Sequence, residues 1–265
     1  MIPPGSRYVA LGSSFAAGPG INPIVDRPAG RSGNNYAHLV AAELGLELTD
    51  VTYSGATTAH VLDTQQDNAP PQLDALTPDT RLVTITVGGN DLDYIGTFIR
   101  GSFLNTVAKP ASIFGRRVAN RIRARVSYLK EDAEYAAVAD ALTTVVERTR
   151  ERAPEARVLL VDYLTLVGPS TRPRLDVPLN EEQLPSVAMM ADGLAAAFAK
   201  AAAATGADLV TASAASRDHA IGSPTPWTTA YSRGLFSPLT GFVPYHPNAA
   251  GMRAVADLVV ETLRA

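Results

Sequence analysis

The stretch Arg-Leu-Val-Thr-Ile-Thr-Val-Gly-Gly-Asn-Asp, residues 81–91, decides the fold class of this chain. Its first seven residues are rich in β-branched side chains, which is typical of a buried strand, and they run directly into a glycine turn. Similar apolar runs occupy residues 7–11, 46–53, 157–164 and 207–211, and helical patterns occupy residues 35–44, 132–153, 181–204 and 248–263. This alternation predicts a parallel sheet with helices on both faces. The active site of such a sheet forms beyond the carboxyl ends of its strands.

Length and composition bound the class of protein. The chain has 265 residues, 46% of them hydrophobic, and a net charge of −3. A chain of that length buries roughly 70–75% of the surface it exposes when unfolded, and no long Pro-, Gly- or Ser-rich stretch divides it. We therefore expect one domain over residues 1–265. The nearly balanced charge gives no global reason to expect nucleic acid or an anionic membrane as a partner. Cysteine is absent, which excludes disulfides, zinc–thiolate sites and a cysteine nucleophile.

Four short segments carry the groups that acyl transfer needs. They are Gly12-Ser13-Ser14, Ser54-Gly55-Ala56, Gly88-Gly89-Asn90-Asp91 and His246-Pro247-Asn248. Together they supply a hydroxyl nucleophile, a backbone donor, an amide donor and an imidazole. Ser14, Gly55 and Asn90 each follow one of the first three predicted strands, so all three are expected at the carboxyl edge of the sheet. Each also has a simpler interpretation alone, because serine caps helices and glycine and asparagine form turns.

The order and spacing of these segments resemble the SGNH (GDSL-type) hydrolases, a family of serine esterases and lipases. Residues 11–18 resemble the first block of the family, with Ser14 at the nucleophile position, and residues 53–58, 87–91 and 245–251 resemble the other three. Residues 31–36 also resemble a stretch found in a secreted branch of the family. The resemblance spans residues 11–251 and implies a flavodoxin-like three-layer α/β/α sandwich with about five parallel strands.

The resemblance also implies a role for each site residue. Ser14 would be the nucleophile and His246 the base, and the Ser14 and Gly55 N–H groups with the Asn90 amide would form the oxyanion hole. No cofactor or metal ion is implied, because no cluster of His, Asp and Glu residues has the spacing of a ligand set. His38 and His60 are interpreted as surface or core residues, and His219 lies in a loop of the secreted branch where the histidine is not the base.

Two positions depart from the family pattern. Ser13 stands where the family usually has aspartate beside the nucleophile, and Val243 stands three residues before His246, where the family has the third triad member. Some members orient the histidine through a main-chain carbonyl instead. We therefore expect a carbonyl at or near Val243 to hold His246. The rival is a carboxylate from elsewhere, with Asp218 the nearest upstream candidate.

A basic stretch follows the third segment. Between Tyr94 and Lys130 the chain has eight basic residues and no acidic one, with apolar residues interleaved at nearly helical spacing. The stretch is interpreted as a basic insertion or lid-like segment at about 97–130. It could be a solvated helix face, a rim that attracts anionic or interfacial substrates, or a nucleic-acid patch.

The sequence thus predicts a serine hydrolase that cleaves a small-molecule or lipid ester. The alternatives are an acyltransferase or thioesterase on the same fold, or a catalytically inactive binding module, for which Ser13 and Val243 are the only hints. No run approaches 18 apolar residues, so we expect no transmembrane segment. The first residues lack a signal-peptide pattern, which predicts a cytoplasmic protein; the alternative is secretion with the signal removed. Nothing in the sequence sets the oligomeric state.

Overall fold

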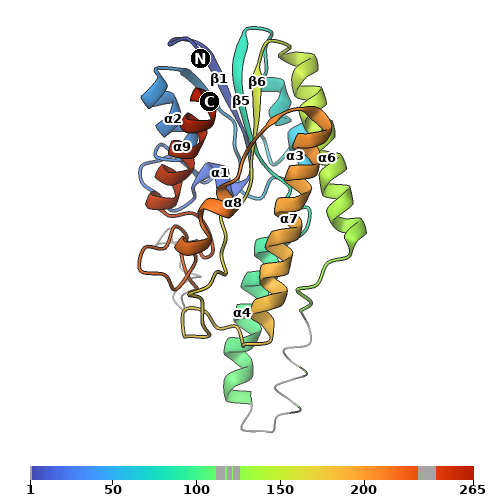
Figure 1. The fold of residues 1–265 in the computed structure, drawn as a ribbon, viewed down its shortest axis with the longest axis vertical. Coiled ribbons are helices and arrows are strands. Elements are labelled where there is room, and N and C mark those ends of the chain that lie inside the picture. Colours follow the sequence, from blue (N-terminus) through green and yellow to red (C-terminus); the bar gives the residue numbers. More distant parts are fainter. Residues whose placement is uncertain (1, 112–116, 118–120, 122–125, 232–242) are drawn as a thin grey trace.

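The central sheet has five parallel strands in the order β4–β1–β5–β6–β7 (Figure 1). The strands are β1 (Arg7–Gly12), β4 (Glu47–Asp50), β5 (Thr80–Thr86), β6 (Arg157–Val161) and β7 (Asp208–Val210). A computed structural model describes residues 2–111, 117, 121, 126–231 and 243–265. The five predicted strands are all present, although β4 and β6 end three residues earlier than their apolar runs do.

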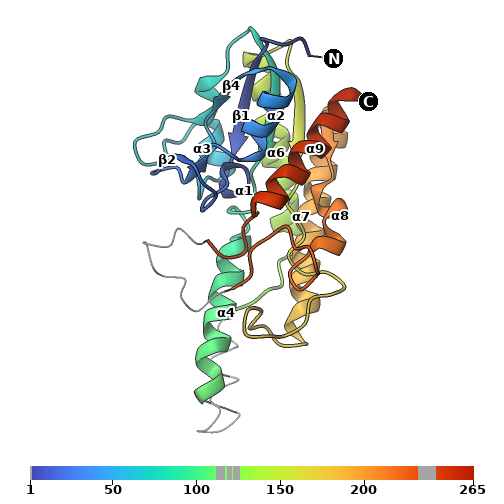
Figure 2. The same cartoon turned by 90° about the vertical axis from the view of Figure 1, so that its left-hand side faces the viewer.

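Helices cover both faces of the sheet (Figures 1 and 2). On one face, α2 (Tyr36–Leu44) packs against α9 (Ala249–Arg264), and on the other α6 (Asp132–Arg152) packs against α7 (Gln183–Thr205) and α3 (Thr58–Leu62). The strand order places β1 between β4 and β5, so the chain reverses its direction of winding after β4. The three-layer α/β/α sandwich predicted from the sequence is therefore confirmed.

Helix ends are where capping residues predict them. Asn35 precedes α2 and its side chain accepts a hydrogen bond from the His38 N–H, and Asn248 caps α9 through the N–H of Gly251. These side chains bond backbone donors that a helix start would leave unpaired. In α2 and α9, therefore, a single polar side chain marks the first turn of the helix.

Several short elements have no counterpart in the apolar pattern. A two-stranded antiparallel sheet pairs β2 (Ile24–Asp26) with β3 (Arg31–Ser32), and α1 (Ser14–Ala17) and α8 (Ala212–Ala215) have four residues each. Among the described residues, the 3₁₀ helices η1 (Gln72–Ala75) and η3 (Arg217–His219) lie in connecting segments. Elements this short contain too few residues for hydrophobic periodicity to show.

The basic stretch begins as a helix. α4 (Tyr94–Ala111) extends beyond the end of the sheet in both views, and it forms the first part of the predicted lid-like segment. Tyr94 and Phe98 are buried, whereas Phe103 and Val107 are 47% and 42% exposed. Residues 112–116, 118–120 and 122–125 of the predicted segment lie outside the described residues.

One helix is long and apolar enough to cross a membrane by length and composition, among the residues that the structure describes. It is α7, and its apolar side chains Val187, Met190, Leu194 and Phe198 are buried in the core of the sandwich. A core helix of a folded domain has the same composition, so packing accounts for the apolar character of α7.

Candidate active site

Ser14 is the first residue of α1, directly beyond the carboxyl end of β1. The N-cap position belongs to Ser13, so helix capping does not account for Ser14. Ser14 is largely buried, with 8% of the residue exposed. Its backbone N–H lies at the first turn of a helix, where no intrahelical acceptor exists, and it is therefore available to a developing negative charge.

His246 lies against Ser14, although the two residues are 232 positions apart. Its Nε2 is 2.8 Å from the Ser14 Oγ, and its Nδ1 is 2.7 Å from the carbonyl oxygen of Pro244. A carbonyl can only accept, so the proton resides on Nδ1 and the Nε2 lone pair faces the serine hydroxyl. This is the tautomer that a base for Ser14 needs.

The sequence predicted a carbonyl at or near Val243, and the acceptor on Nδ1 is the carbonyl of the next residue, Pro244. The carbonyl of Val243 instead accepts a 2.7 Å hydrogen bond from the Thr229 Oγ1, so the assignment to Val243 is corrected to Pro244. The physical reason is the left-handed conformation of Tyr245, with φ +57°, which turns the chain back so that the Pro244 carbonyl faces the ring. Asp218 lies exposed on η3, and the bonds found for the two ring nitrogens of His246 are to Ser14 and Pro244.

Burial sets the protonation state of His246. The residue is 6% exposed, and desolvation lowers its pKa from 6.5 to about 4, against a smaller opposing effect of the Pro244 hydrogen bond. A low pKa keeps the imidazole neutral at pH 7. His246 is thus ready to accept a proton across most of the physiological range.

The second and third predicted segments are hydrogen-bonded to each other. Asn90 donates a 2.8 Å hydrogen bond from Nδ2 to the carbonyl of Ala56, the residue after Gly55. Asp91 accepts from the backbone N–H of Thr58 at 3.1 Å and from its hydroxyl at 2.5 Å. Gly55 has φ +84°, a backbone conformation that favours glycine. The Asn90 amide keeps a second N–H for another acceptor, because each amide nitrogen carries two.

Comparison with known proteins assigns the chain to a family. The model of the GDSL-like lipase/acylhydrolase family matches residues 10–254. The chain belongs to this family. It is 34% identical to Lipase 2 of Streptomyces coelicolor over 264 residues, which cover 97% of this chain and 85% of that protein. It is 29% identical to a lipase of Streptomyces rimosus, over 92% of this chain and 81% of that protein.

Solved structures agree with this assignment. The crystal structure of an extracellular lipase from Streptomyces rimosus superposes with a TM-score of 0.71 at 25% identity, covering 97% of this chain and 100% of that one. A phospholipase A1 from Streptomyces albidoflavus gives a TM-score of 0.69 at 24% identity, over 98% of this chain and 100% of that one, which shows a shared fold. The protein is a carboxylic ester hydrolase of the lipase and esterase class.

Two side chains that the sequence pattern did not indicate hold the site of this GDSL-like hydrolase in place. The Tyr163 hydroxyl accepts from the Gly89 N–H at 3.0 Å and lies 3.1 Å from the Ser13 Oγ. A Cβ on Gly89 would come within 2.8 Å of the Tyr163 ring, so only glycine fits there. The Gln72 side chain pairs with both backbone groups of Gly12, at 2.7 and 3.0 Å. Both partners come from distant parts of the chain, and no local spacing signals them.

Thr229 is a third residue that sequence reasoning missed. Its hydroxyl bonds the Val243 carbonyl at 2.7 Å and accepts from the His246 N–H at 3.2 Å, and its N–H donates to the His246 carbonyl at 2.8 Å. The segment before Thr229 therefore pairs with the segment that carries His246, as the bridge between Thr228 and Pro247 also shows.

The other three histidines have structural contacts. His219 stacks on Trp227 with ring centroids 4.0 Å apart, and its Nδ1 lies 2.9 Å from the carbonyl of Thr225. The His60 Nδ1 accepts from the Thr57 N–H at 3.0 Å in the capping box of α3. His38 contacts Asn35 and Asp50.

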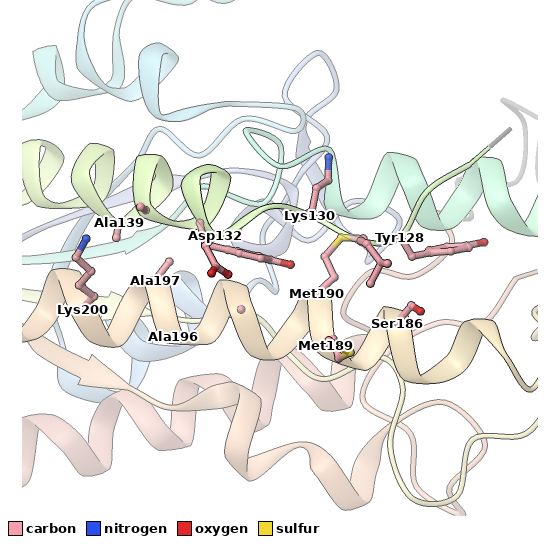
Figure 3. Close-up of a pocket in the computed structure, with 14 residues that line it drawn as sticks. Tyr128, Lys130, Asp132, Ala139, Ser186, Met189, Met190, Ala196, Ala197 and Lys200 are labelled. Atoms are coloured by element: carbon pink, nitrogen blue, oxygen red, sulfur yellow. The ribbon is translucent and has the colours of Figure 1, made fainter. Parts of the chain in front are cut away.

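A cavity of about 430 Å³ lies between α6 and α7 (Figure 3), and neither Ser14 nor His246 lines it. Ala139, Met190 and Gly193 are among its lining residues, and none of the four predicted segments contributes to it. Lys130 and Lys200 at its edges pair with Glu134 and Asp140. In the described part of the chain, no group of three or more His, Asp or Glu side chains is arranged to hold a metal ion.

Proposed function

We propose that this hydrolase cleaves carboxylic acyl esters through an acyl-enzyme intermediate on Ser14, with His246 as general base and acid. The observation that carries the proposal is the 2.8 Å contact between the His246 Nε2 and the Ser14 Oγ, made with the ring held in the required tautomer by Pro244. A nucleophile within hydrogen-bond reach of a base that a third group orients is the arrangement that serine hydrolases use.

The two halves of the reaction use the same groups. The Ser14 Oγ attacks the ester carbonyl carbon as its proton passes to the His246 Nε2, and the tetrahedral adduct collapses when Nε2 returns that proton to the leaving alcohol. Water then attacks the acyl-serine as its proton passes to Nε2, and Nε2 gives that proton to the Ser14 Oγ as the carboxylic acid leaves, which regenerates both groups. The N–H groups of Ser14 and Gly55 and the Asn90 amide would hold the negative oxygen in both adducts.

The missing carboxylate bears on the strength of the base. Pro244 provides a neutral acceptor, which orients the ring and stabilises the imidazolium ion less than an aspartate would. Ser13, where the family usually has an aspartate beside the nucleophile, adds no charge either, because a serine hydroxyl is neutral; its Oγ lies 3.1 Å from the Tyr163 hydroxyl. The reaction is therefore expected to depend heavily on the oxyanion donors.

The first test identifies the nucleophile. A fluorophosphonate should label one serine, and mass mapping should place the adduct on Ser14. Ser14→Ala should abolish turnover of a p-nitrophenyl ester. Ser13→Ala is the matched control, one residue earlier in the same turn, and it should keep much of the activity because Ser13 contacts the site only through Tyr163.

Three results would contradict the proposal: an adduct on Ser13, turnover by Ser14→Ala, or no stoichiometric labelling at all. The last would favour an inactive binding module. Product analysis with an added acceptor alcohol separates hydrolysis from acyl transfer, because a transferase forms the new ester in preference to the free acid.

We further propose that the substrate is a lipid ester met at an interface through the basic segment. The exposed side of α4 supports this, because Phe103 and Val107 are about half exposed and lie one helical turn apart. Apolar side chains combined with basic residues are typical of helices that lie on anionic lipid surfaces.

A further inference from the structure

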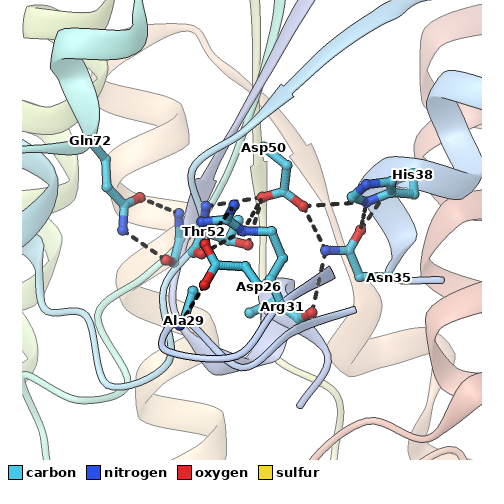
Figure 4. Close-up of polar contacts among 10 residues, drawn as sticks. Asp26, Ala29, Arg31, Asn35, His38, Asp50, Thr52 and Gln72 are labelled. Atoms are coloured by element: carbon cyan, nitrogen blue, oxygen red, sulfur yellow. Dashed lines mark hydrogen bonds and ion pairs between the residues drawn. The ribbon is translucent and has the colours of Figure 1, made fainter. Parts of the chain in front are cut away.

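A buried carboxylate lies at the carboxyl end of β4, and the catalytic steps do not use it. The side chain of Asp50 is 4% exposed, and Figure 4 shows it in the middle of a polar cluster that includes Arg31, Asn35, His38 and Thr52. Burying a charge is unfavourable unless it is paired and hydrogen-bonded, so its partners show what this one holds together.

One oxygen of Asp50 faces the helix that carries the nucleophile. Its Oδ2 accepts a 2.7 Å hydrogen bond from the Asn35 Nδ2, and that amide also donates to the carbonyl of Ala17 at 3.3 Å. Ala17 is the last residue of α1, and Ser14 is the first. The contact from Asp50 therefore reaches the nucleophile helix through one side chain.

The other oxygen faces the oxyanion loop. The Asp50 Oδ1 accepts from the N–H of Thr52 at 3.0 Å and from its hydroxyl at 2.7 Å. The next residue, Tyr53, donates its N–H to the carbonyl of Gly12 at 3.0 Å, and Gly55 follows two residues later. Thr52 is fully buried and is held from its other side by the Arg31 Nε, 3.0 Å from its carbonyl.

The carboxylate is charged in this setting. Burial by itself raises the pKa of Asp50, but hydrogen bonds from His38, Asn35 and Thr52 and the nearby Arg31 outweigh burial and lower the pKa below its ordinary value. Hydrogen bonds to an ionised acceptor are shorter and about twice as strong as neutral ones. The cluster thus connects α1, which carries Ser14, to the loop that leads to Gly55.

We propose that Asp50 is a positioning residue, whose two oxygens set the distance between the Ser14 nucleophile and the Gly55 oxyanion donor. This inference rests on the proposed function, because it assigns a purpose to the cluster only if Ser14 and Gly55 act on the same carbonyl. A displacement of about 1 Å in such a site can lower the rate on the order of 10²-fold. The effect falls on the transition state, since the oxyanion is present mainly there.

The test replaces the carboxylate with an amide of the same shape. In Asp50→Asn one oxygen becomes an NH₂ group that faces the donors of Thr52 or Asn35. Phosphonate labelling counts the active sites. We expect kcat per active site counted in this way to fall roughly 10- to 100-fold, with KM within about twofold. The Ki of a boronic acid, which forms a tetrahedral adduct on a serine, should rise in parallel. A merely structural role would lower Tm and the labelled fraction and leave kcat per site and Ki unchanged.

Two controls complete the design. Asp208→Asn removes the carboxylate that pairs with Arg157 at the amino ends of β6 and β7, and it should leave kcat per site unchanged. Thr52→Val removes only the hydroxyl bond to Asp50 and should lower kcat by about three- to tenfold. Its control is Thr149→Val, which removes the hydroxyl of a buried threonine in α6 and should have no effect on kcat per site.

The outcomes separate this inference from the proposed function. An adduct on Ser14 of the unchanged protein upholds the proposed function whatever the variants do. The role of Asp50 is overturned if folded Asp50→Asn keeps kcat within threefold of the unchanged protein, or if Asp208→Asn loses as much. If Asp50→Asn does not fold, Thr52→Val decides, and an unchanged kcat and boronic-acid Ki there overturn the inference.

Discussion

At the scale of single residues, the depressed pKa of His246 makes the pH profile informative. In the proposed mechanism His246 must be neutral to accept the Ser14 proton, and desolvation lowers its pKa to about 4. The kcat/KM for a neutral soluble ester should therefore stay flat from pH 8 to about 6 and fall with an acid midpoint near 4. A midpoint near 6.5, the ordinary value for histidine, would show that the ring is solvated in the free enzyme.

A second buried group, Asp162, also has a pKa shifted toward this pH range, so the pH profile needs a control. Burial raises the pKa of Asp162 to about 6, and its carboxylate bonds the N–H and hydroxyl of Ser213. Asp162→Asn should leave the acid midpoint of kcat/KM in place, because Asp162 does not contact Ser14 or His246. Circular dichroism at each pH separates loss of catalysis from loss of the fold.

At the scale of elements, the loop that carries His246 depends on the segment at residues 226–229. Thr229→Val removes the hydroxyl that joins the Val243 carbonyl to the His246 N–H. We expect kcat to fall about tenfold with little change in KM, because the ring loses its alignment with Ser14. Thr143→Val, which removes a half-buried hydroxyl bonded within α6, is the matched control and should retain full activity. Equal rates for the two variants would show that Pro244 alone orients His246.

Sequence periodicity located the long elements and missed the short ones, for a physical reason. The strand over residues 80–86 is buried along nearly its whole length, and the helix over residues 249–264 buries one side, so both can be recognised from the pattern of side chains. α1 and the β2–β3 pair are held by turns and side-chain bonds to distant residues. The same holds for Tyr163, Gln72 and Thr229, whose partners become neighbours only when the sheet forms.

The residues of the candidate site were more predictable than the residues that hold them in place. Ser14, Gly55 and Asn90 follow the first three strands of the predicted sheet, so a parallel arrangement alone brings them to one edge. The Pro244 carbonyl was not predictable to the residue, because its position depends on the left-handed turn at Tyr245, which a non-glycine residue seldom adopts. The exact acceptor is a property of that backbone turn rather than of residue type.

At the scale of the whole molecule, charge is distributed unevenly along the chain. The net charge is −3, yet residues 94–130 contain eight basic residues and no acidic one, so the remainder of the chain is strongly acidic. An anionic lipid surface should therefore repel most of the molecule and attract this segment, which follows Asn90 directly in the chain. Such a field orients the protein as well as attracting it.

The last prediction follows from this charge asymmetry. Hydrolysis of an ester in anionic vesicles should fall severalfold as salt rises past about 0.15 M, where the screening length shortens to about 8 Å. Hydrolysis of the same ester in zwitterionic vesicles, and of a neutral soluble ester, should change little. Arg117 and Arg121 are exposed, and the double change R117Q/R121Q should weaken the salt dependence without altering kcat on the soluble ester. Phe103→Ser should instead lower activity on both kinds of vesicle, because an apolar contact does not depend on the lipid charge. Equal salt responses for vesicles and soluble ester would assign the basic stretch to an ordinary solvated surface.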